Sequence, residues 1–528
     1  MADEQPADTP EPESDPPGED VLDSLAAIAN GAGAEVEAQF QQLDKPKSTD
    51  STKSGSGSGA GGDGKEKGPS QATRLVELAN AAFRTVAGAD GKTYAVALTG
   101  PRIALPLRGE MGLRLHLAST YYAETGSAAG SSALADALTV LEGQAMTTTP
   151  EPVALRVARH ENTLVLDLGH ADGRCIVISP GEWHLEPESP VLFRRTRLTS
   201  PIPLPSREVG GLAKLHELLN VSDSGFRLMV AWLVASLFPD IAHPILTICG
   251  EQGTAKSTCG RLLVSVVDES PAPLRTPPKD AGSWPAQAAA SWTVMLDNIS
   301  TIAPWMSDLL CKAVTGDGMV TRALYTDDDV NILSFRRVLG MTTIDAGALR
   351  GDLAERILLA ELDPIPADKR RTEEEVNTLF EQIRPAVLGG VLDQTAAVLA
   401  ALPNVNVAEL PRLADFARIL AALDHVNQAD GWTTLDDYTT LAAELTEAVI
   451  EADPFADAVR TFATSQRSWE GGAAKLLEAL TPAEPPKTWP RTARALSGHL
   501  RRVAPALRRN GVNVEFTRGK ERLIKLTF

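Results

Sequence analysis

The stretch Pro244–Ser257, PILTICGEQGTAKS, decides the fold of this chain. Its first half is a short apolar run, Ile245–Cys249, which predicts a buried β-strand. The run ends at Gly250, and the eight residues from Gly250 to Ser257 have the spacing of a phosphate-binding loop. Glycines in such a loop let backbone N–H groups turn toward an anionic phosphate, and the loop opens a helix whose N-terminal end favours negative charge. We therefore expect a strand–loop–helix unit that binds a nucleotide.

The loop residues have different expected roles. Lys256 would reach the β- and γ-phosphates of ATP, and Ser257 would place its hydroxyl on Mg²⁺. The residues expected to contact the nucleotide are Gly250, Glu251, Gln252, Gly253, Thr254, Ala255, Lys256, Ser257 and Thr258. Ala255 departs from the pattern, because a second glycine usually precedes the lysine. The alternative for the loop by itself is an ordinary strand–turn–helix corner.

A second apolar run, Trp292–Leu296, leads into Asp297 and Asn298. It predicts a strand with a carboxylate at its C-terminal end, which is where α/β sheets place functional groups. Asp297 would hold the Mg²⁺, directly or through water. Asn298 stands where many ATPases have a glutamate that polarises the attacking water, and an amide can orient a water but cannot act as a base. Either another carboxylate, with Asp280 as a candidate, acts on the water in ATP hydrolysis, or the turnover of ATP is slow.

Composition sets the class of protein. With 528 residues, 43% hydrophobic and 23% charged, the chain should fold as a soluble globular protein of about two to four domains. The net charge of −19 argues against a protein that coats nucleic acid nonspecifically, although a local basic surface remains compatible with it. The four cysteines form no CxxC pair, so neither a zinc site nor a disulfide framework is indicated, and a reduced cytoplasmic setting fits.

Shifts in composition predict five regions. Residues 1–70 read as an acidic, Gly/Ser-rich disordered tail, 71–200 as a mixed α/β domain, and 201–365 as an ATPase core. Residues 366–454 read as a helical lid or connecting bundle, and 455–528 as a last domain. No membrane segment is expected, because the most apolar helix candidate, Phe226–Phe238, is too short to span a bilayer and contains Arg227. Residues 72–200 show no paired-carboxylate metal site, which disfavours a primase-polymerase.

Taken together, the motifs resemble AAA+ ATPases of the superfamily 3 helicase type, as found in replication proteins and primase-helicases of phages and other mobile elements. The resemblance rests on GEQGTAKST (250–258), MLDNIS (295–300), SDLLCKAVTGDGMVTRALYTDDD (307–329) and RGDLAERILL (350–359). It covers residues 190–365 most firmly. It implies a P-loop AAA+ core that assembles into a homo-oligomeric ring, usually a hexamer, with ATP at the subunit interfaces.

The resemblance also assigns residues. Thr342 falls at the position of a polar sensor residue that contacts the γ-phosphate or water, and Arg356 at that of an arginine finger, with Arg350 as second candidate. The alternative for Arg356 is an intrahelical ion pair with Asp352. Residues 316–329 match a pore hairpin, so that Lys312 and Arg322 would face DNA; their alternative is solvent or an intersubunit salt bridge. The three aspartates at 327–329 read as a solvated turn rather than a metal site.

The last domain has the pattern of a winged helix, three helices followed by two alternating strands. From Lys487 onward, Lys and Arg number 11 against two Glu, a net +9 within an acidic chain. The residues that would contact DNA phosphates are Arg494, Arg501, Arg502, Arg508, Arg509, Arg518 and Lys520. The alternative is a basic helix that docks on acidic parts of the same ring.

We therefore expect an ATP-dependent DNA-translocating ATPase, a replicative helicase of a phage or mobile element. It would have DNA as partner and a primase or other replication protein as a candidate partner of the N-terminal region. The alternative is a nucleotide-switched DNA-binding or assembly ATPase that hydrolyses ATP slowly and does not unwind DNA.

Overall fold

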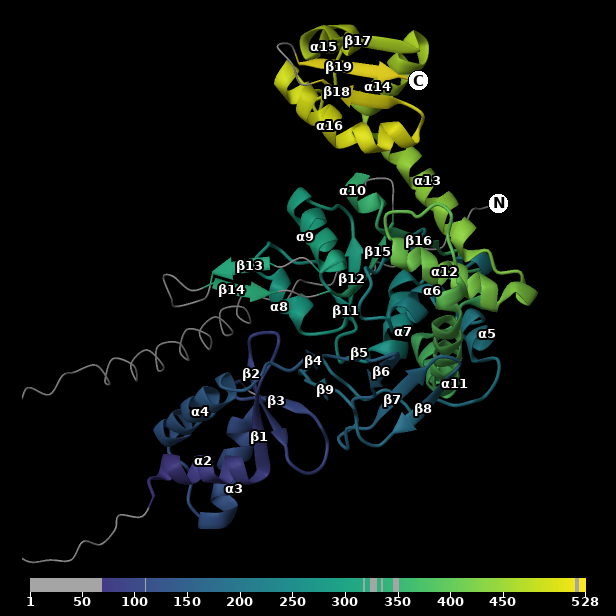
Figure 1. Cartoon of the computed structure of the whole chain (residues 1–528). Helices are drawn as coiled ribbons and strands as arrows, with labels where there is room; N and C mark the ends of the chain where they lie inside the picture. Colours follow the sequence, from purple (N-terminus) through teal and green to yellow (C-terminus); the bar gives the residue numbers. More distant parts are fainter. Residues whose placement is uncertain are drawn as a thin grey trace, which may run out of the picture. The chain divides into compact units, whose positions relative to one another are not determined.

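A computed structural model describes the chain over most of its length (Figure 1). The described residues are 69–109, 111–316, 319–322, 330–333, 336–344, 351–517 and 522–528. The chain divides into two compact units, Met1–Lys67 and Gly68–Phe528, and every described residue lies in the second. The acidic tail expected over residues 1–70 falls almost wholly outside the described residues.

A five-stranded parallel sheet forms the centre of the second unit. Its strand order is β11, β12, β15, β10, β16, and every neighbouring pair is parallel. The strands are β11 (Leu274–Arg275), β12 (Thr293–Ile299), β15 (Val338–Thr343), β10 (Ile245–Cys249) and β16 (Ile357–Glu361). The strands predicted from the apolar runs Ile245–Cys249 and Trp292–Leu296 are thus confirmed, and both end at the same edge of one sheet, together with β15.

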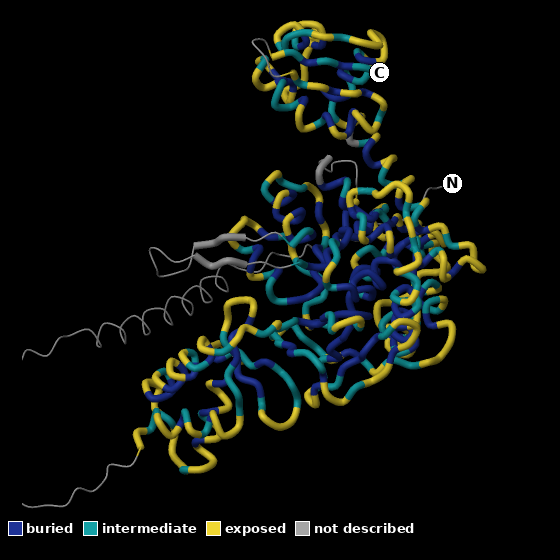
Figure 2. The backbone as a smooth tube through the Cα atoms, viewed as in Figure 1, coloured by how far each residue is buried: buried dark blue, intermediate teal, exposed yellow. Residues whose placement is uncertain are grey.

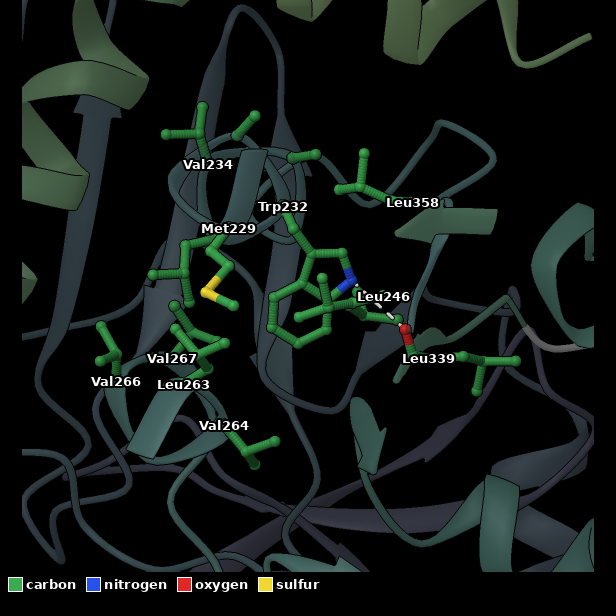
Figure 3. Close-up of a cluster of buried hydrophobic side chains, with 14 of the residues drawn as sticks. Met229, Trp232, Val234, Leu246, Leu263, Val264, Val266, Val267, Leu339 and Leu358 are labelled. Atoms are coloured by element: carbon green, nitrogen blue, oxygen red, sulfur yellow. Dashed lines mark hydrogen bonds between the residues drawn. The ribbon is translucent and has the colours of Figure 1, made fainter. Parts of the chain in front are cut away.

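Helices cover the sheet, and its two central strands, β10 and β15, are buried along their whole length. All five residues of β10 are buried, as is usual for a parallel strand with neighbours on both sides. Helices α6 (Asp223–Ala235) and α7 (Lys256–Val267) pack on it, and Figure 3 shows Trp232 of α6 among the aliphatic side chains of this core. The indole Nε1–H of Trp232 donates to the carbonyl of Leu339 in β15, 3.3 Å away. The tube in Figure 2 is accordingly buried along these strands.

Three helices follow the sheet along the chain. They are α11 (Glu373–Ala401), α12 (Ala414–Val426) and α13 (Thr434–Ala452), which confirms the predicted helical stretch. A capping box at Thr372 and Glu375 begins α11. By length and composition α11 is apolar enough to cross a membrane, but half of that apolar window is buried inside the protein, as in a core helix.

Helix α5 (Gly211–His216) contacts both α6 and α11. The His216 ring stacks on the Phe226 ring of α6, with centroids 4.3 Å apart. A Cβ at Gly211 would come within 2.2 Å of the Ala386 backbone in α11. Ser222 caps α6 through a hydrogen bond from the Gly225 N–H.

The first described segment has a hydrophobic core of its own. Its elements are α2 (Gln71–Ala82), β1 (Phe83–Ala87), β2 (Thr93–Ala97), β3 (Ala104–Pro106), α3 (Leu113–Thr125) and α4 (Ser131–Met146). Helix α2 ends at Ala82, because Phe83–Ala87 pairs as an antiparallel strand with β2. A strand that is chosen by its partner in this way is not visible in helical periodicity.

The β-rich segment that follows packs on the central core, and Leu192 at its end also packs on the first segment. Its antiparallel sheet consists of β5 (Val157–His160), β6 (Thr163–Asp167), β7 (Cys175–Ser179) and β8 (Glu182–Glu186), flanked by the pair β4 (Val153–Ala154) and β9 (Leu192–Phe193). Side chains of β5–β8 share one hydrophobic cluster with α6, α7, α11 and the parallel sheet. A buried ion pair adds to this contact: Arg156 Nε lies 2.8 Å from Asp268 Oδ1 at the end of α7.

Between β11 and β16 the chain forms α8 (Trp284–Ala289), α9 (Pro304–Thr315), an antiparallel hairpin of β13 (Met319–Arg322) and β14 (Val330–Leu333), and the short α10 (Gly351–Ala354). The hairpin expected over 316–329 is therefore present, although its acidic turn lies outside the described residues.

The last segment consists of three helices and a three-stranded antiparallel sheet. Its elements are α14 (Pro454–Gln466), β17 (Ser468–Gly472), α15 (Ala473–Leu480), α16 (Ala493–Arg509), β18 (Asn513–Phe516) and β19 (Leu523–Thr527). The three predicted helices and two predicted strands are all found. Strand β17 was missed, since Ser-Trp-Glu-Gly-Gly has neither alternation nor β-branched residues and becomes a strand only by pairing with β19.

Candidate functional site

The sheet order brings three sequence motifs to one place. Strand β15 lies between β10 and β12, so the end of β15 separates the Gly250 loop from Asp297. The register pairs Ile248 of β10 with Thr342 of β15. Because parallel strands share a carboxyl edge, the loop, Asp297 and Thr342 meet there, in the position where open α/β sheets bind ligands.

The loop backbone has the shape that its glycines allow. Gly250 has φ +145°, and a Cβ there would lie 2.7 Å from the carbonyl oxygen of Leu362. Gly253 has φ +85°. Ala255, in the position where glycine is usual, adopts φ 61° and ψ 32°, a left-handed conformation that costs an L-residue roughly 1–2 kcal/mol. Ala255 therefore departs from the motif in residue type only, because its backbone has the left-handed conformation that a glycine would adopt there.

The ammonium of Lys256 lies over the loop. Its Nζ donates to the carbonyl oxygens of Gly250, at 2.8 Å, and Glu251, at 2.6 Å. The loop is braced from inside by the buried Thr254, whose hydroxyl donates to the Glu251 carbonyl at 3.0 Å. It is braced from outside by Asn220, whose amide donates to the Thr254 carbonyl at 3.1 Å. The cationic group therefore sits at the mouth of a preformed concave loop.

One carboxylate oxygen of Asp297 contacts side chains from the other two motifs. Asp297 Oδ1 accepts a hydrogen bond from Ser257 Oγ at 2.8 Å and another from Thr342 Oγ1 at 2.6 Å. Ser257 and Asp297 are 40 positions apart in the sequence, and Thr342 and Asp297 are 45 apart. The residues predicted to bind Mg²⁺ and the predicted sensor residue are therefore in direct contact.

Asn298 has a backbone role at this site. It has φ +57°, and the register of β12 with β15 shifts between Leu296 and Ile299, as at a β-bulge. Asparagine is among the residues that tolerate this left-handed conformation. The bulge lets the Asn298 N–H donate to Thr342 Oγ1 at 2.8 Å, which leaves the Thr342 hydroxyl proton for Asp297. The side chain of Asn298 is exposed.

The donors at this place fit a magnesium ion. Mg²⁺ prefers hard oxygen ligands and is usually held by one or two protein oxygens together with phosphates and waters. The Ser257 hydroxyl and the Asp297 carboxylate supply two such oxygens beside a loop shaped for phosphate. Within the described part of the chain, no group of three or more His, Cys, Asp or Glu could hold a metal by itself.

The remaining residues predicted for hydrolysis lie elsewhere. Arg356 stands at the N-terminal end of β16, the opposite edge of the sheet from the loop, and it is 7% exposed, so its side chain lies inside the single chain. Helix α10 ends at Ala354, so Arg356 follows this helix and is not part of it. Arg350 lies outside the described residues. Asp280 accepts the Ser283 N–H within its own turn, at 2.8 Å.

Sequence reasoning missed a pocket beside the loop. It has a volume of about 440 Å³ and lies between the start of the loop, strand β16 and helix α13. Apolar contacts come from Leu359, Leu441 and Leu445, and the carboxylates of Glu361 and Glu444 also line it. No sequence motif marks it, because α13 follows the loop by almost two hundred residues and its leucines are those of any amphipathic helix.

The basic residues predicted to contact DNA are placed in two groups. Lys312 is exposed on α9, and Arg322 lies in β13, whose side chains are outside the described set. Helix α16 carries Arg494, Arg501, Arg502, Arg508 and Arg509, all exposed. Arg518 and Lys520 also lie outside the described residues.

A groove of about 1360 Å³ runs between α16 and the strands β18 and β19. Arg494, Arg501, Arg508 and the unpredicted Arg522 line it. The Arg501 guanidinium lies 5.0 Å from the centre of the Phe516 ring. Two of the arginines expected to contact phosphates already have protein partners. Arg508 donates to the Val514 carbonyl at 2.8 Å, and Arg509 pairs with Glu355 at 3.2 Å.

Solved structures resemble the chain only distantly. The apo C-terminal region (305–718) of NrS-1 is 11% identical, covers 87% of this chain and 99% of that one, and has a TM-score of 0.36. "SCCmec type IV Cch - active helicase" is 11% identical, covers 84% and 93%, and scores 0.43. JCV helicase is 12% identical, covers 45% and 64%, and scores 0.24. No curated protein matches the chain.

Family models give the more informative match. Residues 212–448 match the model described as actinomycete integrative conjugative element replication protein. Residues 455–527 match the model of the C-terminal domain of the same replication protein. The segment that carries the loop, Asp297, Thr342 and the helices after the sheet, and the basic domain that follows it, are therefore both similar to replication proteins of actinomycete integrative conjugative elements.

Proposed function

We propose that this protein is an ATP-dependent, DNA-translocating ATPase that serves replication of a mobile element of the integrative conjugative kind. The observation that carries the proposal is the contact of Ser257 and Thr342 with one oxygen of Asp297, directly beside the glycine loop. A loop hydroxyl, a strand-end carboxylate and a polar residue on the strand between them are the parts that phosphoryl transfer from a nucleotide requires.

Each residue has a role in this proposal. The Gly250–Thr258 backbone binds the phosphates, and Lys256 exchanges its contacts with the loop carbonyls for contacts with the β- and γ-phosphates. Ser257 and Asp297 hold Mg²⁺, which neutralises the charge that develops on the transferred phosphoryl group. Thr342, fixed by the Asn298 N–H, keeps Asp297 oriented and positions the attacking water. The pocket at Leu441 and Leu445 takes the nucleoside.

The fold supports an AAA+ core of the superfamily 3 helicase type. The phosphate-loop strand β10 and the Asp297 strand β12 are separated by one inserted strand, β15. In such a protein ATP binds between subunits of a ring, usually a hexamer. The finger would come from Arg350 or from Arg356 of a neighbouring subunit; Arg356 would have to leave its buried position to act in this way.

DNA is the proposed second ligand. The C-terminal helices and sheet serve as a winged helix, with the groove along α16 as its basic surface. The arginines there neutralise phosphates, so binding should weaken steeply with salt. Lys312 and Arg322, beside and within the β13–β14 hairpin, would contact the translocated strand. The protein would act in the cytoplasm, where the N-terminal segment could hold a primase or other replication partner.

Rates of single-turnover ATP hydrolysis and of fork unwinding test the proposal, with Lys256→Ala as the inactive control. We expect hydrolysis that DNA stimulates, unwinding that requires ATP, and loss of both in the control. Hydrolysis that ignores DNA, together with no unwinding by the wild-type protein, would count against a motor.

A second candidate is a nucleotide-switched DNA-binding or assembly ATPase. Asn298 favours it, because its amide cannot accept a proton from the attacking water. Slow hydrolysis would then set the lifetime of a DNA-bound assembly. Rapid DNA-stimulated turnover by the wild-type protein would exclude this candidate.

A further inference from the structure

Glu355 lies at a junction of three segments that are far apart in the sequence. It follows α10 directly, and its side chain is 10% exposed. Its Oε2 accepts a hydrogen bond from Arg412 Nη1 at 2.6 Å, and its Oε1 lies 3.2 Å from Arg509 Nη2. Arg412 precedes α12, and Arg509 is the last residue of α16. One carboxylate therefore links the ATPase core, the helices that follow the sheet, and the basic helix.

The junction is also tied to the phosphate loop through the backbone. The carbonyl of Arg356, the residue after Glu355, accepts the Ile245 N–H at 2.7 Å. Ile245 begins β10, and the other end of β10 opens into the loop at Gly250. A buried parallel strand with neighbours on both sides is a stiff element. The backbone therefore connects the residue after Glu355 to the phosphate loop through a single strand.

Arg509 has two competing partners in this arrangement. Its side chain is 46% exposed, so a DNA phosphate can reach the guanidinium. A phosphate bound there would place a second negative charge beside Glu355, and like charges at short range repel. Loss of Arg509 to a DNA phosphate costs Glu355 little free energy, because Arg412 still pairs with its largely buried carboxylate.

We propose that Glu355 couples DNA binding at the C-terminal domain to the nucleotide site. In the DNA-free protein the Glu355–Arg509 pair holds the end of α16 against α10 and restrains the start of β10. A phosphodiester that binds Arg509 releases this pair. Glu355 is a positioning residue in this inference, which rests on the proposed function for its ATPase readout but not for the contact itself.

The test uses the full chain and four variants. Glu355→Gln removes the charge at constant size, Arg509→Gln removes the partner, and the double variant closes the cycle. Asp240→Asn is the matched control, since Asp240 forms a comparable pair with Arg159, at 2.6 Å, away from the junction. The measurements are backbone hydrogen exchange without DNA, DNA affinity by fluorescence anisotropy of a labelled oligonucleotide, and ATP hydrolysis with and without saturating DNA.

We expect Glu355→Gln to speed hydrogen exchange in α10 and in the last turn of α16, and to tighten DNA binding ~2–5-fold, the range of a partly exposed ion pair. Its DNA-free hydrolysis should rise to the DNA-saturated rate, so that stimulation disappears. Arg509→Gln should lose stimulation too but bind DNA more weakly. The double variant should show no further loss of stimulation, and Asp240→Asn should behave as wild type.

Two outcomes would overturn the inference. One is unchanged DNA stimulation in Glu355→Gln when the wild-type protein is stimulated. The other is unchanged hydrogen exchange and unchanged DNA affinity in that variant. Should the wild-type protein not hydrolyse ATP at all, the proposed function fails, and the exchange and affinity measurements still decide whether Glu355 and DNA compete for Arg509.

Discussion

Replacing Thr342 with valine removes one hydroxyl from the centre of the candidate site and changes little else. The residue is 1% exposed, so water cannot take the place of the lost group. The change deletes the acceptor of the Asn298 N–H and the donor to Asp297 Oδ1. A hydrogen bond to a charged group contributes about 1.5–3 kcal/mol, and an unsatisfied buried donor costs about 1–3 kcal/mol.

These magnitudes predict two separable effects. The free energy of unfolding should fall by about 2 kcal/mol, because partial relaxation offsets part of the two losses. Without the Thr342 hydroxyl, Asp297 is no longer held in the orientation that the transition state requires. Loss of this hydrogen bond to a charged group lowers the rate of ATP hydrolysis by about 10–150-fold, whereas the affinity for ATP changes far less. Single-turnover hydrolysis, binding of a fluorescent ATP analogue and urea unfolding would measure the three quantities.

Thr342→Ser is the matched control for this experiment. It keeps the hydroxyl and removes only a buried methyl group, so we expect about 1 kcal/mol less stability and a hydrolysis rate close to that of the wild type. Equal losses of hydrolysis in Thr342→Val and Thr342→Ser would refute the role of the hydroxyl. So would full activity in Thr342→Val.

Three further predictions concern backbone strain, a buried histidine and a buried ion pair. Ala255→Gly should leave the free energy of unfolding unchanged or raise it by up to about 1 kcal/mol in urea unfolding, because relief of the left-handed Ala255 backbone exceeds the added entropy of the unfolded chain. Ala135→Gly, in the middle of α4, should cost about 1 kcal/mol; equal losses at both positions would contradict the strain argument. Burial lowers the pKa of His243 to about 4, while its Nε2–H donates to the backbone carbonyl of Phe238 at 2.9 Å. The unfolded chain then binds the proton more readily than the folded one, so His243 should lower stability as pH falls from about 6.5 to 4, by up to roughly 3 kcal/mol. A His243→Gln variant whose unfolding free energy keeps the wild-type slope over that range would contradict this. Arg156→Ala should cost about 3–5 kcal/mol in urea unfolding, because it leaves Asp268 buried without its guanidinium. Arg159→Ala, at a more exposed pair, should cost about 1 kcal/mol or less, and a similar cost at both positions would show that burial of the pair is not the cause.

Local sequence patterns were enough to predict the loop and its strand. The apolar run Ile245–Cys249, the glycines and the Lys-Ser pair each specify backbone or chemistry within a few residues, and the structure has a strand, a loop and a helix there. The strand ending in Asp297 and the three helices of the last domain were readable for the same reason. Periodicity and turn residues act over distances that a single sequence displays.

What the sequence could not show are relations between residues far apart in the chain. It drew attention to the side-chain chemistry of Asn298, and the structure adds a backbone role, a left-handed bulge that fixes Thr342. Strand β17, the pocket under α13 and the burial of Arg356 depend likewise on partners that are far away in the chain.

The chain by itself determined that the apolar runs Ile245–Cys249 and Trp292–Leu296 become strands, which loop has the pattern of a phosphate-binding loop, and where basic charge accumulates. The tertiary structure decided that β15 enters between β10 and β12, and so brings Thr342 to Asp297; it also brought Arg509 to Glu355. The physical reason is that backbone propensity and hydrophobic period are local properties. Strand order and side-chain contact follow instead from burying all apolar faces of the chain at once.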